Sequence, residues 1–265
     1  MAQGCGGVMA TAGDNEVFEP TRENLSRYQV PEWFHDAKIG FFYHWGPSSV
    51  IGDHWNKDVM DFCRQQGKYA GSNLAKRNPP GQWGANMYPN PGKPQSEQNS
   101  NSVLQRKWYG DQKKFGYKDL IPLMTGSKFD PAKMVRLLDE AGVKYVVPMA
   151  VHHDGFAMWD SKVIDEFNTA KMGPKKDTVR MVVEQARRRR MKVGVSTHAA
   201  RHSWYFPKPA GYDVSDPRYV QLYGEGLGKG GLPRPEAMKK WKDTLGELVE
   251  TFSPDYIFVD GGTAD

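Results

Sequence analysis

The sequence predicts an α/β fold of the (β/α)8 TIM-barrel type, and three observations lead to this prediction. Short apolar segments rich in β-branched and aromatic residues alternate with amphipathic helical patterns, which is typical of a parallel sheet. Each apolar segment ends in histidine, tryptophan or aspartate, and functional side chains at strand ends are typical of the mouth of such a barrel. The first segment is followed by "HWGPSS", whereas a doubly wound sheet would more often carry a glycine-rich phosphate turn there.

Four segments are expected to form buried parallel strands. They are short, rich in Val, Ile, Phe and Tyr, and bounded by polar or turn-forming residues. The expected strands span residues 38–46 (KIGFFYHWG), 144–153 (KYVVPMAVHH), 192–199 (KVGVSTHA) and 255–262 (DYIFVDGG). Because only about four βα units are visible, the barrel is expected to be truncated.

Helical patterns precede the last three strands and begin at Asp130, Asp177 and Pro235. The two aspartates suit N-caps, because a carboxylate accepts a hydrogen bond from a free backbone N–H of the first turn. Pro131 suits the first helical position, and Gly142 suits a C-terminal stop. The expected order is therefore strand, helix, strand, helix, strand, helix, strand.

One domain is expected, residues 31–265, preceded by a flexible N-terminal segment, residues 1–30. Within the domain, a long insertion at about residues 51–128 is rich in Gly, Pro, Asn, Gln and Lys. Connections of this length are usually functional lids or partly disordered insertions.

Composition argues against several classes of protein. Mean hydropathy is −0.69, and no apolar run approaches the roughly 18 residues that a membrane span needs, so no membrane partner is expected. The net charge of +5 is modest, and the basic run at residues 186–190 is expected to be a solvated helix end, so no nucleic-acid partner is expected. Two cysteines provide neither a disulfide framework nor a CxxC metal motif. No secretory signal is visible at the N-terminus, and the oligomeric state is left open.

Histidines lie at the ends of three of the expected strands, namely His44, the pair His152 and His153, and His198. They can hold a metal, hold a sugar, or fill a core. Imidazole is a good zinc ligand, but consecutive residues of a strand point to opposite faces, so His152 and His153 do not suit one ion. We therefore expect no metal, and no cofactor is expected.

A sugar site is the favoured interpretation of these histidines. A single histidine is more often a structural residue of the core or of a loop, with its hydrogen bonds made inside the protein. Several histidines that converge at strand ends favour a binding site over this structural alternative. Neutral imidazoles exchange hydrogen bonds with hydroxyls, and nearby rings such as Trp45 and Trp159 offer faces for C–H surfaces. For each tryptophan alone, packing at the rim or in the core is an equal alternative.

Asp260 ends an otherwise apolar strand and precedes two glycines, which allow close approach of a backbone or a ligand. A helix N-cap is the main structural alternative. In a catalytic interpretation, Asp260 is a nucleophile or a general base.

Four motifs resemble, in order and spacing, the catalytic domain of the alpha-L-fucosidases of glycoside hydrolase family 29. They are EWFHDAKIGFFYHWG, FGYKDLIPLMTGSKFDPAKMVRLLDEAGVKYVVPMAVHHDGFAMWDSK, MGPKKDTV and SPDYIFVDG, and the match runs from about Pro31 to Gly262 with an interruption at 51–80. The resemblance implies a retaining exo-glycosidase that cleaves terminal alpha-L-fucose, or a related sugar, from a glycan by double displacement. It also implies a secreted, periplasmic or lysosomal location.

The same resemblance implies roles for single residues. Asp260 falls in the place of the family's nucleophile. His44 matches the histidine of its H-W-G motif, and the H-H pair of the family binds sugar hydroxyls. The expected substrate contacts are His44, Trp45, Gln82, His152, His153, Trp159, His198 and Phe42.

This chain also departs from the family pattern. Gln82 stands where members often carry a glutamate, and Val151 stands where a lysine usually precedes the H-H pair. The usual tyrosines and serine after the third strand are replaced by Ser196, Thr197 and His198. No residue of the chain matches the family's general acid/base. Two rival hypotheses therefore stay open: a non-catalytic sugar-binding remnant, and a metal-dependent barrel hydrolase.

Overall fold

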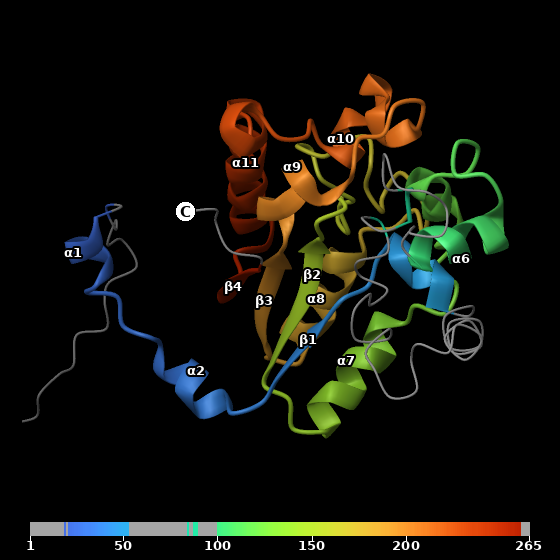
Figure 1. Cartoon of the computed structure of the whole chain (residues 1–265). Coiled ribbons are helices and arrows are strands. Elements are labelled where there is room, and N and C mark those ends of the chain that lie inside the picture. Colours follow the sequence, from blue (N-terminus) through green and yellow to red (C-terminus); the bar gives the residue numbers. More distant parts are fainter. Residues whose placement is uncertain (1–18, 20, 53–83, 85–86, 90–99, 261–265) are drawn as a thin grey trace, which may run out of the picture. The chain divides into compact units, whose positions relative to one another are not determined.

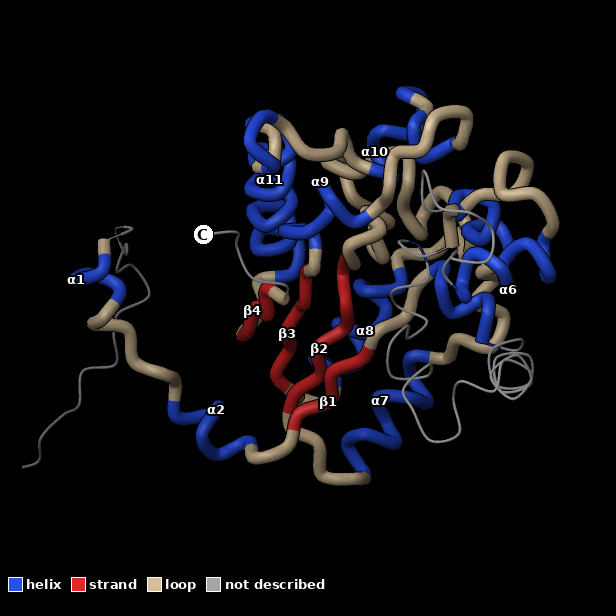
Figure 2. Tube along the Cα trace, viewed as in Figure 1, coloured by secondary structure: helices blue, strands red, loops and turns tan. Residues whose placement is uncertain are grey.

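Four strands form one parallel sheet in the order in which they follow along the chain, β1-β2-β3-β4 (Figures 1 and 2). The structure is a computed structural model and describes residues 19, 21–52, 84, 87–89 and 100–260. The strands are β1 (Gly40–Tyr43), β2 (Tyr145–Val151), β3 (Lys192–Thr197) and β4 (Tyr256–Val259). Each lies inside a segment that the sequence predicts to be a strand, which confirms an α/β fold with a parallel sheet.

Three helices alternate with the strands: α7 (Pro131–Glu140) precedes β2, α8 (Thr178–Arg188) precedes β3, and α11 (Pro235–Phe252) precedes β4. Helix α8 packs against β2 and β3, and α7 packs against α8. Both predicted N-caps are confirmed. The Asp130 carboxylate accepts a hydrogen bond from the backbone N–H of Lys133 at 2.9 Å, and Asp177 accepts one from Arg180 at 2.8 Å.

Shorter helices lie at the start of the chain and in the connections. The α-helices among them are α1 (Arg22–Leu25), α2 (Glu32–Ala37), α6 (Ser100–Tyr109), α9 (His202–Tyr205) and α10 (Val220–Tyr223). The 3-10 helices are η1 (Pro47–Ile51), η4 (Tyr117–Leu123), η5 (Ala199–Arg201), η6 (Asp213–Ser215), η7 (Pro217–Tyr219) and η8 (Lys229–Gly231). Among the residues described, no helix combines the length and the apolar character that crossing a membrane requires.

The hydrophobic core is centred on the two inner strands. Every residue of β2 after Tyr145 is buried, and so is every residue of β3 after Lys192. Burial on both faces explains why these strands are continuous apolar runs and do not alternate with polar residues. Large buried side chains from the connections complete the core, among them Tyr117, Phe156 and Trp159.

The chain divides into two compact units, residues 1–38 and residues 39–265. The first unit contains α1 and α2. The second contains the whole sheet and the remaining elements. The boundary between the units therefore lies between residues 38 and 39. The boundary that the sequence predicts lies between residues 30 and 31.

Candidate functional site

Four side chains meet where the carboxyl ends of the strands lie side by side. His44, His152, His198 and Asp260 are each the first residue after a strand, from β1 to β4 in that order. Because the strands are parallel, these four positions lie together at the carboxyl ends of the strands. The ring centroid of His198 lies 4.5 Å from that of His44 and 4.6 Å from that of His152. With His153, whose ring lies 4.6 Å from that of His152, these histidines form what we call the histidine cluster.

His198 lies at the centre of the cluster, and only 1% of its surface is exposed. Its Nδ1 is 3.0 Å from Oδ2 of Asp260, whose side chain is about half exposed. Despite this short distance, neither ring nitrogen of His198 has an aligned hydrogen-bond partner among the residues described. Buried polar atoms in proteins are normally hydrogen-bonded, so these nitrogens need a partner such as a ligand hydroxyl.

Burial keeps the histidines of the cluster neutral. It lowers the pKa of His152 to about 2, with further lowering by the neighbouring histidines. It lowers the pKa of His198 to about 4, against the opposing effect of Asp260. The pKa values of His44 and His153 are also lowered, again chiefly by burial. A neutral imidazole has one donor and one acceptor, so the cluster can both donate hydrogen bonds to hydroxyls and accept them.

The end of β2 is built to place two consecutive histidines together. The pairing of β2 with β3 shifts register between Met149 and Val151, directly before His152. Such irregularities re-aim side chains at the ends of strands. His153 is then fixed by a hydrogen bond of 2.6 Å from its Nδ1 to the carbonyl oxygen of His198. Because a carbonyl oxygen only accepts, Nδ1 of His153 carries the proton and Nε2 is the acceptor.

The predicted aromatic contacts lie in different places. The Phe42 ring is parallel to that of His198 at 6.4 Å, and 43% of this residue is exposed, so it borders the cluster. Trp45 is half-buried and stacks on Phe129 at 4.7 Å. Trp159 is fully buried in the hydrophobic core, so the structure does not bring it to the cluster surface. Gln82 lies outside the described residues.

Three histidines of the cluster have an arrangement that could hold a metal ion. One ring nitrogen each from His44, His152 and His198 lies within 4.8 Å of the others. The three residues follow three different strands. The sequence argument against a metal concerns consecutive residues of one strand, whose side chains point to opposite faces, so it does not apply to these three. Their lowered pKa values leave nitrogen lone pairs available.

The buried carboxyl group of Asp154 is not among the site residues that the sequence predicts. Asp154 follows the histidine pair directly and accepts hydrogen bonds from the Tyr117 hydroxyl and from the backbone N–H of Phe156. Burial raises the pKa of Asp154 to about 6. Tyr117 also contacts the Ser48 hydroxyl at 3.1 Å, so Asp154 ties the segment after β2 to η1 and η4. The only sequence signal is the position of this aspartate in "HHD".

Comparison with known proteins gives one consistent family. A family profile described as alpha-L-fucosidase matches residues 8–265. The tissue alpha-L-fucosidase of Mus musculus is 26% identical over 251 residues, which cover 92% of this chain and 43% of that protein. The plasma alpha-L-fucosidase of Homo sapiens is 27% identical over 251 residues, which cover 92% of this chain and 42% of that protein. The chain thus spans less than half the length of these relatives.

Solved structures give the same result. The crystal structure of Thermotoga maritima alpha-fucosidase matches with a TM-score of 0.66 and 28% identity, covering 93% of this chain and 50% of that one. The structure of the same enzyme in complex with fucose matches with a TM-score of 0.65 and 26% identity, covering 94% of this chain and 50% of that one.

Proposed function

The chain belongs to the alpha-L-fucosidase family, and from this premise we propose that it contributes the sugar subsite and the nucleophile of a retaining exo-glycosidase. The substrate is a glycan that ends in alpha-L-fucose or a related sugar. One observation carries the proposal: the Asp260 carboxylate lies 3.0 Å from a buried, neutral His198 at the shared end of four parallel strands. A secreted, periplasmic or lysosomal location is the one expected for this activity.

The histidine cluster suits a sugar better than an anion or a cation. At neutral pH its imidazoles are uncharged, and His198 has two ring nitrogens that lack aligned partners among the described residues. Hydroxyl groups both donate and accept, so they satisfy such nitrogens in either direction. Phe42 at the border supplies an apolar surface next to these polar atoms, as a deoxysugar with a methyl group requires.

Asp260 acts as the nucleophile in this proposal. Its carboxylate attacks the anomeric carbon while the bond to the leaving oxygen breaks, and water then hydrolyses the glycosyl ester. A retaining mechanism also needs a general acid about 5 to 5.5 Å from the nucleophile. The proposal gives this chain the nucleophile and the sugar contacts, and it names no such acid.

A (β/α)8 barrel is the architecture we propose for this site. The strand order β1-β2-β3-β4 runs in one direction, with one long helix before each of the last three strands. A doubly wound sheet instead reverses its direction of growth at a switch point, next to which it binds its ligand. The sequential order and the position of Asp260 at a strand end support the barrel.

The test is covalent trapping of the 265-residue chain with 2-fluoro-fucosyl fluoride, followed by peptide mass spectrometry. We expect the label on Asp260 and no label in an Asp260→Asn variant. With an aryl fucoside as substrate, that variant should lose activity by roughly 100-fold or more. Asp243→Asn, in an exposed ion pair on α11, is the matched control and should behave as the parent chain does. A label on another carboxylate would remove Asp260 from its role.

Metal-dependent hydrolysis is the second candidate, because His44, His152 and His198 place three nitrogens close together. Elemental analysis and treatment with a chelator separate the two candidates. Under the glycosidase proposal, turnover of an aryl fucoside is insensitive to the chelator. Sugar binding without turnover or trapping would instead favour the non-catalytic remnant.

A further inference from the structure

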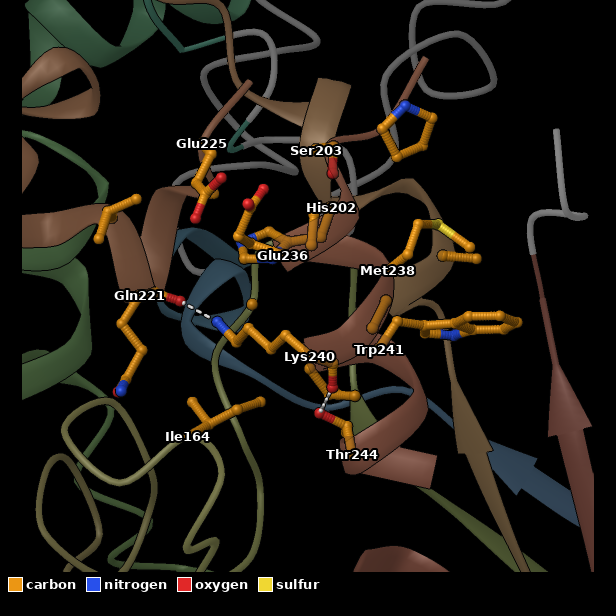
Figure 3. A pocket seen from close by; sticks show the side chains of 18 of the residues that line it. Ile164, His202, Ser203, Gln221, Glu225, Glu236, Met238, Lys240, Trp241 and Thr244 are labelled. Atoms are coloured by element: carbon orange, nitrogen blue, oxygen red, sulfur yellow. Dashed lines mark hydrogen bonds between the residues drawn. The ribbon is translucent and has the colours of Figure 1, made fainter. Parts of the chain in front are cut away.

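A cavity of about 500 Å³ lies between the N-terminal half of α11, α10 and the segments that follow β2 and β3 (Figure 3). None of the four histidines of the cluster lines it, and neither does Asp260. Its walls are mainly apolar and include Val163, Ile164, Leu232 and Met238. A mainly apolar cavity of this size with a few polar groups is typical of a site for a small molecule.

One half-buried cation lines this cavity. Lys240 extends from α11, and its Nζ donates a hydrogen bond of 2.7 Å to the backbone carbonyl of Gln221 (Figure 3). An ammonium group has three N–H donors. The described residues provide no second acceptor for Nζ, so most of its bonding capacity is unused by the protein.

Lys208 provides an internal comparison for Lys240. Burial lowers the pKa of both side chains to about 8. Nζ of Lys208, however, donates to three backbone carbonyls, those of Val214 at 2.7 Å, Tyr223 at 2.9 Å and Gly224 at 2.7 Å. Lys208 is therefore a saturated structural cation. Lys240 is equally easy to deprotonate, but its nitrogen is left able to react.

Two carboxylates line the same cavity, Glu225 and Glu236 (Figure 3). Glu225 favours the charged form of Lys240 and thereby opposes the effect of burial on its pKa. Two negative charges disfavour an anionic ligand.

We propose that Lys240 is a nucleophilic amine and that this cavity admits small neutral aldehydes with an apolar body, which form an imine with Nζ. No side chain of the histidine cluster lines this cavity, and the chemistry at Lys240 does not rest on the proposed glycosidase function.

The reaction needs no oxidant or reductant. The lone pair of neutral Nζ attacks the carbonyl carbon, a C–N bond forms, and the carbonyl oxygen receives a proton to give a carbinolamine. The C–O bond then breaks, the second proton of the amine leaves with that oxygen as water, and a C=N bond remains. Water that enters the open cavity carries these protons.

The test uses benzaldehyde as the probe and sodium cyanoborohydride to reduce the imine irreversibly on the folded 265-residue chain. Peptide mass spectrometry then gives the labelling rate of each lysine at pH 7.5. A lysine with a pKa of about 8 has on the order of 100-fold more neutral amine at this pH than a lysine of ordinary pKa. We expect Lys240 to be labelled at least tenfold faster than Lys208, and also faster than exposed Lys239, which pairs with Asp243.

Two controls show whether fast labelling of Lys240 depends on binding in the cavity or only on the reactivity of its amine. Excess benzyl alcohol, which has the same shape but no carbonyl group, should protect Lys240 and leave the rate at Lys239 unchanged. Lys240→Met should abolish this labelling, with circular dichroism used to verify folding. Equal labelling rates at Lys208 and Lys240, or no protection by benzyl alcohol, would overturn the proposal. Both measurements use the unsubstituted chain, so they do not depend on whether the Lys240→Met variant folds.

Discussion

Three histidines, of which His198 is buried and His152 and His202 are half-buried, make the stability of the protein depend on pH. The pKa is lowered to about 2 for His152, about 3 for His202 and about 4 for His198, in each case mainly by burial. In the unfolded chain a histidine has a pKa of about 6.5. At a pH between the folded and the unfolded pKa of a histidine, the unfolded state binds a proton and the folded state does not, so acid favours unfolding.

We therefore expect the free energy of unfolding to fall as the pH is lowered from about 6.5 to about 4. Each of the three histidines contributes up to about 1.4 kcal/mol per pH unit. Asp154 acts in the opposite direction between pH 6 and 4, because burial raises its pKa to about 6 and its folded form takes up a proton first. Urea denaturation at several pH values measures the balance. An unfolding free energy that is constant over this range would contradict neutral, buried histidines.

His202 allows one of these contributions to be isolated. Its Nε2 donates a hydrogen bond of 2.7 Å to the carbonyl oxygen of Leu222. In His202→Gln, the side-chain amide retains a donor but does not titrate. We expect this variant to lose stability less steeply with acid, by up to about 1.4 kcal/mol per pH unit, in the same denaturation series. An unchanged slope would mean that His202 is protonated in the folded state.

At this scale the sequence predicts what depends on near neighbours. The N-caps at Asp130 and Asp177 follow from local chemistry, and the meeting of His44, His152 and His198 follows from their places after strands. The burial of Trp159 does not follow, because its environment is set by distant segments that pack around it. The Asp154–Tyr117 hydrogen bond is hidden for the same reason, since the partners are 37 residues apart.

At the scale of elements, the absence of a side chain at one glycine lets the segment after β2 pack closely against α9 and α10. Gly155 has a φ of +76°, and a Cβ placed there would lie 2.4 Å from Nε2 of His202 and 2.6 Å from the carbonyl oxygen of Leu222. Gly155→Ala should therefore lower the free energy of unfolding by roughly 2 kcal/mol or more, from backbone strain and overlap together. Thermal and urea denaturation measure this loss.

Gly246 is the matched control in α11. A Cβ there would meet nothing within 4 Å. Gly246→Ala should stabilise the protein by about 0.5–1 kcal/mol, because alanine loses less backbone entropy than glycine on forming a helix. If both substitutions had the same sign, the packing around Gly155 would not be as close as the structure shows.

The existence and order of the elements can be predicted from the sequence better than their ends can. The apolar segment at residues 38–46 contains a strand of only Gly40–Tyr43, because His44 and Trp45 turn away to the site and to Phe129. The register shift in β2 has no sequence signal that we recognise, although it helps to place His152. Irregularities of this kind depend on the neighbouring strand.

At the scale of the whole molecule, β1 and β4 are the outer strands of the sheet in the part of the chain that the structure describes. Near them lie exposed apolar side chains: Ile39 is 55% exposed, Phe42 43% and Val259 40%. Unpaired strand edges with apolar side chains promote association between chains. We expect the 265-residue chain to self-associate as its concentration rises, as measured by sedimentation velocity. Val259→Lys should weaken the association, and a monomer at all accessible concentrations would show that the edges are protected.

The fold class could be predicted because it depends on a repeated pattern along the chain. Alternation of apolar strands with capped helices specifies a parallel sheet, and the residues after each strand indicate which end carries the site. The arrangement of η4, α6 and α10 around that end could not be predicted, since these short elements have no periodic signal and are held by tertiary contacts. The cavity beside Lys240 belongs to this second group.

The sequential strand order has a consequence for how the protein is made. Each strand pairs with the strand that was synthesised before it, and only β1 has to wait for a partner that lies far along the chain, because the long insertion separates it from β2. The sheet can therefore grow by one strand and one helix at a time during translation, and at every stage the newest strand is the exposed edge. Asp260, which follows β4, therefore joins the histidines only after the three strands that precede them have been made.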